Sequence, residues 1–465
     1  MTTLPENISK TAPKLPDGPK TPIILQTIQG IARPLEYLEK ARSQYGDCFT
    51  MRSLGFPPIV VLSHPKAIQQ VLNADPHQFT TGELNKSLEP IMGENSLIRL
   101  DGERHASQRR LITPPFHGER MRAYGKIICD IAVQVMNEWT VGNVQPIHSA
   151  MQEISLRVII RAVFGIDEGE RYQKLRQLLT LWLNAFNSPL SSSPLFLGFL
   201  QQDWGAWSPW GRFLRLRQQI DQLLYAEIQE RRQQNHNSGE DILSLMMSAC
   251  DVDGQPMSDI ELRDELMTLL FGGHETTASA LAWAFYWIHQ LPEVRDKLLK
   301  ELETLGDQPE PTDIARLPYL NAVCSETLRI YPIVIFTFVR IVKSPIEIMG
   351  DHFEPGTILA PCIYLTHHRS DLYPEPEQFK PERFLERQFA PYEYFPFGGG
   401  NRRCIGMAFA QFEMKLVLAT VLSNFKLALA DTRKVLPVRR GITLTPAGGV
   451  PMIITSHQKG KQTSI

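Results

Sequence analysis

The stretch FGGGNRRCIG, residues 397–406, decides the fold, because it gathers four glycines and two adjacent arginines around one cysteine, Cys404. Three interpretations compete for it. Gly398-x-Gly400 begins like a dinucleotide fingerprint, but residue 403 is an arginine and no βαβ pattern surrounds the stretch. A redox or nucleophilic cysteine activated by the arginines is the second, although no histidine or second cysteine is close in sequence. A metal-bound thiolate at a loop-to-helix junction is the third.

The residues on either side favour the metal-bound thiolate. We expect Cys404 to open the helix IGMAFAQFEMKLVLATVLSNF, whose free N–H groups and dipole stabilise a thiolate. The glycines at 398–400 let the loop lie flat against a planar group without Cβ clashes. Phe397 covers the sulfur side, and Arg402 reaches an anionic group at the edge. A macrocycle with carboxylate arms meets all these demands, so the expected cofactor is haem b with Cys404 as the axial ligand of its iron.

The composition sets the class of protein. The chain has 465 residues, 43% hydrophobic and 21% charged, as in an ordinary globular protein. Its formal net charge of −2 indicates no nucleic-acid partner. None of the six cysteines lies within thirty residues of another, which favours a reducing compartment over a disulfide framework. The N-terminus has neither a signal peptide nor a transmembrane anchor, so we expect a cytoplasmic protein.

The chain reads as one domain, mainly α with minor β. Residues 1–25 form an extended, proline-containing leader, and residues 26–465 form the domain. Helical patterns dominate from Pro34 onward. The segment TMRSLGFPPIVVLS predicts a β-hairpin around a Gly-Phe-Pro-Pro turn, and a second strand-rich patch covers residues 333–364.

One helix is predicted to cross the whole molecule. Ser258 and Glu261 form a capping box, and the helical pattern continues to His289, which makes the helix about 50 Å long. Its middle, FGGHETTAS, contains two glycines and two threonines, which weaken a helix. Such a stretch marks either a functional bulge or close packing of another element against the glycines.

A second motif, SETLR, places Glu326 and Arg329 at i, i+3 spacing on one helical face. Arg383, in FKPERF, offers a second guanidinium. The pair is either a solvated helix pair or, with Arg383, a set of bidentate contacts that locks the helix to the chain leading to Cys404.

These motifs together resemble the cytochrome P-450 superfamily. The matching elements are Phe397-x-x-Gly400-x-Arg402-x-Cys404-x-Gly406, Glu326-x-x-Arg329, PERF at 381–384 and GGHETT at 272–277, in the family's order from about residue 30 onward. The resemblance implies a soluble bacterial-type haem-thiolate monooxygenase with the single-domain P-450 fold. In that fold a long central helix covers the distal face of the haem and the cysteine loop lies on the proximal side.

The resemblance also implies roles for individual residues. Glu275 and Thr276 take the acid and alcohol positions of the oxygen-activation groove, which the Gly272–Gly273 weakness would let both side chains share. His274 has no expected role. The cofactor-binding residues implied are His105, Arg109, Arg340, Phe397, Arg402 and Gly406.

The resemblance also places the substrate pocket around residues 77–100, the apolar stretch IVIFTF at 333–338 and residues 443–445. Because IVIFTF is almost wholly apolar, we expect a lipophilic substrate. The residues expected to line the pocket are Ile333, Val334, Phe336 and Leu444. A long-chain fatty acid or alkane is preferred over a terpenoid or steroid. Four tryptophans lie between Leu178 and Leu216; they form a mobile lid, a patch for peripheral contact with lipid, or aromatic packing between two helices.

The reaction needs O2 and an electron source. With 59 residues after Gly406 (465 − 406), we expect no fused reductase, so electrons come from a ferredoxin or flavodoxin with its reductase. Arg387, Arg403 and Lys415 are candidate docking charges, or simply solvated. Rival readings are members that consume hydroperoxides or peroxide, a non-catalytic haem-binding protein, and a flavin or NAD oxidoreductase.

Overall fold

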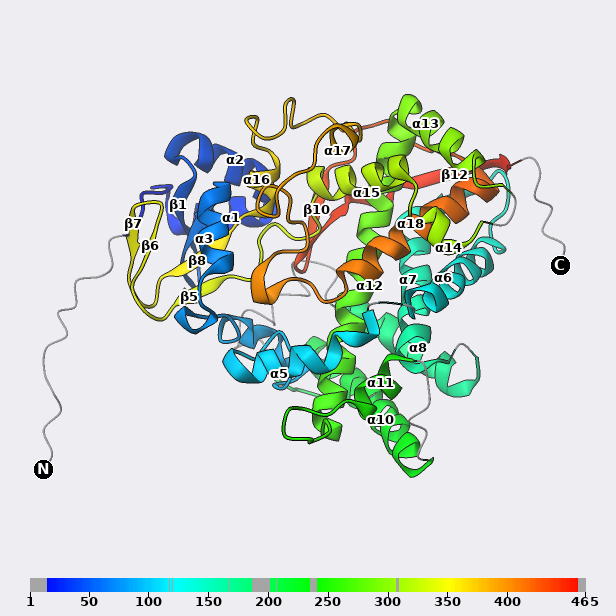
Figure 1. The fold of residues 1–465 in the computed structure, drawn as a ribbon, viewed down its shortest axis with the longest axis horizontal. Helices are drawn as coiled ribbons and strands as arrows, with labels where there is room; N and C mark the ends of the chain where they lie inside the picture. Colours follow the sequence, from blue (N-terminus) through cyan, green and yellow to red (C-terminus); the bar gives the residue numbers. More distant parts are fainter. Residues whose placement is uncertain are drawn as a thin grey trace, which may run out of the picture.

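The molecule is mostly helical, and β1 and β5–β8 lie with α1–α3 in the left part of Figure 1. The computed structural model describes residues 15–458 apart from 117, 119, 167, 186–200, 206, 235–240 and 307–308. Its longer helices are α1 (Ile23–Ala32), α2 (Pro34–Tyr45), α3 (Pro65–Asn73), α5 (Gly102–Ile112), α6 (Arg120–Met136), α7 (Ile147–Phe164), α8 (Glu170–Asn184), α10 (Pro209–Gln234), α12 (Asp259–Gln290), α13 (Pro292–Glu303), α15 (Pro318–Ile330) and α18 (Met407–Asn424). Shorter ones are α4 (Glu89–Met92), α11 (Ile242–Ser248), α14 (Pro311–Ile314), α16 (Ile363–His367) and α17 (Arg383–Glu386).

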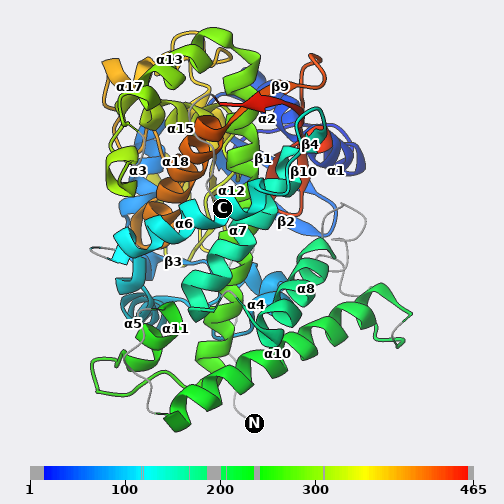
Figure 2. The ribbon, with the colours of Figure 1, turned by 90° about the vertical axis from the view of Figure 1, so that its right-hand side faces the viewer.

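The predicted long helix is α12, which runs through the middle of the molecule with α7 and α18 packed against it (Figure 2). Its capping box is confirmed: the Ser258 N–H donates to the Glu261 carboxylate at 2.9 Å, and the Glu261 N–H donates to Ser258 Oγ at 3.3 Å. At 1.5 Å per residue its 32 residues span about 48 Å. Most of its side chains are buried, so α12 is the axis of the core.

In the part of the chain that the structure describes, the β structure consists of a five-stranded sheet with the order β1-β2-β8-β5-β3 and three smaller sheets. In the large sheet β2 pairs parallel to β8, with Ile59 opposite Ile358, and its other pairs are antiparallel. The strands of the large sheet are β1 (Cys48–Ser53), β2 (Phe56–Leu62), β3 (Phe79–Thr80), β5 (Arg340–Val342) and β8 (Ile358–Pro361). The smaller sheets contain β4 (Val144–Pro146), β6 (Ile346–Ile348), β7 (Asp351–Phe353), β9 (Phe425–Leu429), β10 (Pro437–Arg440), β11 (Thr443–Pro446) and β12 (Pro451–His457).

Two local expectations need correction. The hairpin forms, but its turn is Leu54–Gly55, and Pro57 and Pro58 lie inside β2, at its exposed start. Proline is tolerated there because the first residues of a strand need few ladder donors. The expected leader boundary at residue 25 falls inside α1, a helix that sequence reasoning missed.

The tryptophan-rich region divides into two parts. Trp182 is fully buried, stacks on Phe213 at 6.2 Å and meets the ring of Phe271 edge-on at the same distance. Trp204 and Trp207 stack on each other at 6.2 Å but are 62% and 75% exposed. Aromatic packing therefore describes the first part, whereas the second faces solvent.

None of the helices in the described residues is both long enough and apolar enough to cross a bilayer.

Candidate active site

Cys404 follows a short 3-10 turn, Gly400–Arg402, and its N–H donates to the Phe397 carbonyl at 2.9 Å. Its side chain is exposed, yet burial is the largest influence on its thiol and raises the pKa. The Gly406 N–H and the charge of Arg109 oppose that rise without cancelling it. A side chain that is both accessible and surrounded by protein lies on the wall of an internal hollow.

The expected helix does not start at Cys404. α18 begins at Met407, with Gly406 as its N-cap, because the chain turns once more after the cysteine. The Gly406 N–H still bonds the sulfur, so a backbone donor reaches Cys404 as anticipated although the helix begins later.

Two of the loop glycines have tight contacts with α3, while their expected role beside a planar group stays a prediction. A Cβ on Gly400 would lie 2.2 Å from the Leu72 carbonyl oxygen, and its φ is +62°. A Cβ on Gly399 would lie 2.8 Å from Leu72 Cδ1. Gly400 is therefore needed for close packing on α3, because it meets backbone there, whereas Gly399 meets only the end of the flexible Leu72 side chain. A Cβ on Gly406, in contrast, would meet nothing within 4 Å, so this glycine borders open space.

The middle of α12 provides a second open surface. Gly272 is exposed, and a Cβ there would meet no atom within 4 Å. Thr276, one turn later, is half-buried, and its hydroxyl donates to the Gly272 carbonyl at 2.6 Å. Open residues halfway along a buried helix indicate that the middle of α12 also borders a hollow.

The expected bulge is absent, because α12 is regular from Asp259 to Gln290. Gly273 instead allows close packing: a Cβ would lie 3.0 Å from Ile159 Cδ1 on α7. Glu275 and Thr276 do not share one groove, since Glu275 turns toward α7. There it accepts a hydrogen bond from Gln152 Nε2 at 2.7 Å and pairs with His148 Nε2 at 3.3 Å.

The environment of Glu275 keeps it ionised. Burial is the largest single influence and raises the pKa of the carboxyl. The hydrogen bond and charge of His148, together with the hydrogen bond from Gln152, lower the pKa by more than burial raises it. The net pKa lies below the usual range. Neighbouring His274 is buried, which lowers its pKa to about 4, and its Nδ1 has no partner among the described residues.

Four basic side chains gather at the edge of the Cys404 loop: His105, Arg109, Arg340 and Arg402. Arg402 pairs with Asp101 at 2.5 Å, and Arg109 donates to the Arg403 carbonyl at 2.7 Å. Burial, with the charges of Arg402 and Arg109, lowers the pKa of His105 to about 3.

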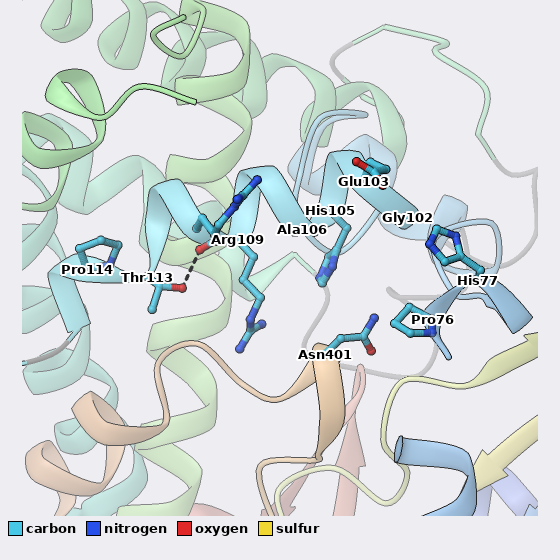
Figure 3. A pocket seen from close by; sticks show the side chains of 11 residues that line it. Pro76, His77, Gly102, Glu103, His105, Ala106, Arg109, Thr113, Pro114 and Asn401 are labelled. Atoms are coloured by element: carbon cyan, nitrogen blue, oxygen red, sulfur yellow. Dashed lines mark hydrogen bonds between the residues drawn. The ribbon is translucent and has the colours of Figure 1, made fainter. Parts of the chain in front are cut away.

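Burial is also the largest influence on Arg340, and with the nearby charge of Arg402 it lowers the pKa of Arg340 to about 10. Among the described residues, Asp101 is the one carboxylate that acts on this cluster, so the cluster has an excess of positive charge. Such an excess fits a cofactor with carboxylate arms. His105 and Arg109 project from α5 toward Asn401 of the loop, on the wall of a pocket of about 690 Å³ (Figure 3).

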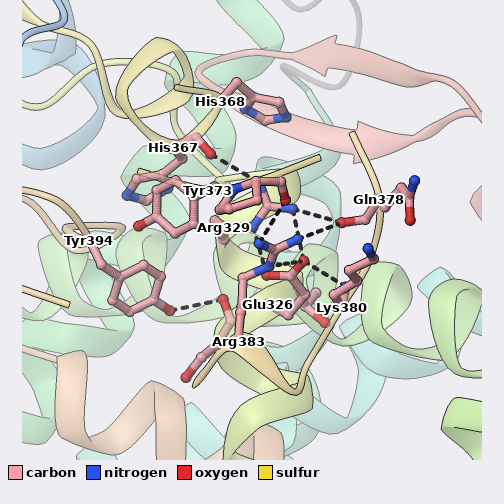
Figure 4. A network of polar contacts seen from close by, with 12 residues as sticks. Glu326, Arg329, His367, His368, Tyr373, Gln378, Lys380, Arg383 and Tyr394 are labelled. Carbon is pink, nitrogen blue, oxygen red and sulfur yellow. Dashed lines mark hydrogen bonds and ion pairs between the residues drawn. The ribbon is translucent and has the colours of Figure 1, made fainter. Parts of the chain in front are cut away.

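A buried polar network joins α15 to the Cys404 loop (Figure 4). Both oxygens of Glu326 bond Arg329, at 2.6 and 2.8 Å, and one also accepts from Arg383 at 3.2 Å. Arg329 donates to the His367 carbonyl at 2.9 Å, and His367 Nε2 accepts from the Phe395 N–H at 3.0 Å. Glu326 and Arg329 are fully buried, so the pair is not a solvated one.

Three of the four expected substrate residues, Ile333, Phe336 and Leu444, belong to the main core cluster, whereas Val334 does not. Leu444 is fully buried in the main core, and its N–H donates to the Ile333 carbonyl at 2.8 Å. Val334 packs instead against a separate cluster that contains Phe395. Phe336 is half-buried, as is Ile335, which was not singled out.

Sequence reasoning missed His148, Gln152, Asp101 and His367. A signal existed for the first two, because His148, Gln152 and Ser155 form a polar stripe at helical spacing on α7, most of whose residues are buried. Ser155 Oγ donates to the Gly273 carbonyl at 3.0 Å. No local pattern marks Asp101 or His367.

The comparisons with known proteins agree with this geometry. The model of the cytochrome P-450 family matches residues 15–450. A Mycobacterium tuberculosis protein named cytochrome P-450 135B1 is 34% identical over 451 residues, covering 97% of this chain and 93% of the relative. Cytochrome P-450 138 of the same organism is 32% identical over 438 residues, covering 94% and 95%. The solved structure of cyanobacterial CYP120A1 with retinoic acid bound has a TM-score of 0.81 at 26% identity, covering 95% of this chain and all of that one.

The chain therefore belongs to the cytochrome P-450 family. Its members are haem-thiolate monooxygenases with a cysteine as the axial ligand of iron, so the predicted fold class, enzyme class and cofactor are confirmed.

Proposed function

We propose that this cytochrome P-450 hydroxylates a long, apolar substrate in the hollow between the Cys404 loop and the middle of α12. The observation that carries the proposal is that Cys404, Gly272 and Thr276 are open although they lie deep in the fold. The half-buried side chains of Ile335 and Phe336 supply apolar contact area, with few polar groups to orient a ligand.

The cofactor site is assigned from the donor set. Cys404 would supply the thiolate ligand of the iron, and the carboxylate arms would be held by His105, Arg109, Arg340 and Arg402. Phe397 and Gly406 belong to the same site, since Gly406 leaves open space beside Cys404. When bound, haem supplies the iron chemistry that activates O2 for insertion of one oxygen atom into a C–H bond.

Two residues of α12 are assigned to proton delivery. Thr276 presents its hydroxyl on the wall of the hollow, and the bond to the Gly272 carbonyl orients it. Glu275 holds its charge on the α7 side, where His148 and Gln152 fix the carboxylate. Glu275 would pass protons inward from α7 to the hydroxyl of Thr276.

The remaining assignments concern structure. Glu326, Arg329 and Arg383 fix α15 to the chain that carries Cys404. Residues 26–465 act as one catalytic domain, although α1 extends its beginning to residue 23.

The preferred substrate is a long-chain fatty acid or alkane, because the wall at Ile335 and Phe336 is apolar. A terpenoid is the second candidate, and one observation favours it: the related CYP120A1 structure holds retinoic acid, an isoprenoid chain that ends in a carboxylate. Both candidates are long apolar chains.

Electrons are assigned to a separate ferredoxin or flavodoxin with its reductase. Of the candidate docking charges, Arg387 already pairs with Glu393 at 2.8 Å, and Lys415 donates to the Ala315 carbonyl at 3.2 Å. Within the described residues the Arg403 guanidinium donates to the Met407 sulfur and forms no ion pair, which leaves its charge for a partner.

The first experiment is an optical titration of the purified holoprotein with fatty acids, alkanes and terpenoids. A low-to-high-spin shift of the Soret band with fatty acids or alkanes supports the preferred substrate, and a shift only with terpenoids replaces it. The absence of thiolate character after reduction with carbon monoxide would contradict the assignment of Cys404.

A second experiment separates turnover from haem binding alone. Thr276→Ala should divert electrons to hydrogen peroxide while substrate still shifts the spectrum, because the hydroxyl is lost and the wall is kept. A parent protein with no substrate-dependent oxygen use would instead indicate a non-catalytic haem-binding protein.

A further inference from the structure

The helix α1 has its polar side inward and its apolar side outward. Gln26 is its buried residue, at 3% exposure, whereas its large apolar side chains are 39–58% exposed: Ile23, Ile24, Leu25, Ile28 and Ile31. Leu54 and Phe56, 58% and 48% exposed, join them from the β1–β2 turn, because the Leu54 N–H donates to Thr27 Oγ1 at 2.8 Å. These seven apolar residues are called the α1 patch.

Hydrogen bonds to Gln26 hold α1 in this orientation. Its side-chain amide donates to the carbonyls of Pro19 and Thr21, both at 2.8 Å. Its carbonyl oxygen accepts from Tyr37 at 3.0 Å and from the Arg52 N–H at 3.3 Å. A buried amide with four partners fixes the rotation of the helix, so the exposed apolar face is a built feature.

Positive charge lies directly beside the α1 patch. A pocket of about 380 Å³ is lined by Lys20 and Arg52 together with Ile23 and Gln26. Neither the Lys20 ammonium nor the Arg52 guanidinium forms an ion pair with any described residue. Asp17 also lines the pocket and is its one carboxylate. Two cations against one carboxylate, next to an apolar helix face, complement an anionic amphiphile.

We propose that the α1 patch docks this protein on the surface of an anionic lipid bilayer. α1 would lie in the plane of the interface with its apolar face among the acyl chains and acidic headgroups at Lys20 and Arg52. Its ten residues span about 15 Å, half of what crossing a bilayer requires. A second copy fits less well, because a two-fold contact would bring both pairs of cations into one apolar interface.

The test is co-sedimentation of the full-length holoprotein with vesicles of phosphatidylcholine, with and without phosphatidylglycerol. The protein should bind the mixed vesicles. Ile24→Gln/Ile28→Gln should weaken that binding by about a hundredfold, roughly tenfold for each exposed isoleucine. Lys20→Gln/Arg52→Gln should remove only the gain from phosphatidylglycerol, because it leaves the apolar face in place.

The matched control is Val252→Gln, which removes an apolar side chain that is 75% exposed elsewhere and should leave binding unchanged. An unaltered Soret spectrum and unfolding midpoint would show that each variant folds. Equal vesicle binding by the parent and by Ile24→Gln/Ile28→Gln would overturn the proposal. So would a dimer in sedimentation velocity that this double variant abolishes while vesicles bind neither protein. No substrate or turnover enters these measurements, so they stand apart from the proposed hydroxylation.

Discussion

The substitution Glu326→Ala tests how much the buried network beneath the Cys404 loop contributes to stability. The carboxylate accepts two bonds from Arg329, one from Arg383 and one from the Lys380 N–H at 2.8 Å. Arg329 and Arg383 also stack on the Tyr373 ring, at 5.2 and 6.0 Å, so neither can move freely toward water. Removing the carboxylate leaves two buried guanidinium groups with carbonyl partners alone.

Breaking a buried ion pair by removing one partner costs about 3–5 kcal/mol. Glu326→Ala should therefore lower the free energy of unfolding by that amount. Haem retention should also fall, because His367 links the network to Phe395, which lies two residues before the Cys404 loop (residues 397–406). Urea unfolding followed by far-ultraviolet circular dichroism measures the first effect, and haem content after gel filtration measures the second.

The matched control is Glu36→Ala. Glu36 pairs with Arg33 at 3.3 Å and at the same three-residue spacing, but the two side chains are 69% and 74% exposed. Solvent screening limits such a pair to about 0.5 kcal/mol. A loss below about 1 kcal/mol in Glu326→Ala, or equal losses in both variants, would refute the argument from burial.

Three further predictions concern buried carboxyls, buried histidines and glycines. Burial raises the pKa of Glu413 to about 8, so its stabilising effect is complete below pH 4.5 and is lost as the pH rises through 8. Glu413→Gln should thus gain up to about 3 kcal/mol over the parent at pH 7, measured by urea unfolding at pH 5 and 7. Burial lowers the pKa of His289 to about 4. As the pH falls below 6.5, the imidazole therefore takes up a proton in the unfolded chain before it does so in the folded protein, which lowers the free energy of unfolding. His289→Gln should reduce by about 2 kcal/mol the decrease in the free energy of unfolding between pH 6.5 and 5. The same decrease in the variant and in the parent would contradict this prediction. Gly400→Ala should disrupt the loop by colliding with Leu72, whereas Gly406→Ala should leave the apoprotein's unfolding midpoint unchanged and reduce only haem content.

The features that could be predicted from the sequence are those whose partners lie within a few residues of each other. The capping box of Ser258 and Glu261 and the contact of Glu326 with Arg329 both depend on three-residue spacing along a helix. The length of α12 followed from its cap and from the proline at 292. Such spacing fixes geometry before tertiary packing acts.

The features that could not be predicted depend on contacts between distant segments. Gly400 packs on Leu72 and Gly273 packs on Ile159, but no pattern in the sequence around either glycine indicates which residue it will contact. α1 was missed because its apolar residues do not form the core-facing stripe that usually identifies a helix in a sequence. Its rotation is set by Gln26, whose partners include the N–H of Arg52. Tertiary hydrogen bonds therefore override the usual reading of an apolar helix as a core helix.

The regular course of α12 changes how its two proposed proton-transfer residues work together. Consecutive side chains on an α-helix are about 100° apart, so Glu275 and Thr276 cannot both face the hollow without a bulge. Because Gly273 packs on α7 and no bulge forms, Glu275 stays on the α7 side, fixed by His148 and Gln152, and Thr276 alone borders the hollow. Turning the carboxylate inward would break its contacts with His148, Gln152 and Ser279, and a hydrogen bond to a charged group contributes about 1.5–3 kcal/mol. The Glu275 carboxylate therefore points inward in only a minor fraction of the molecules, and the strength of its contacts with α7 sets that fraction.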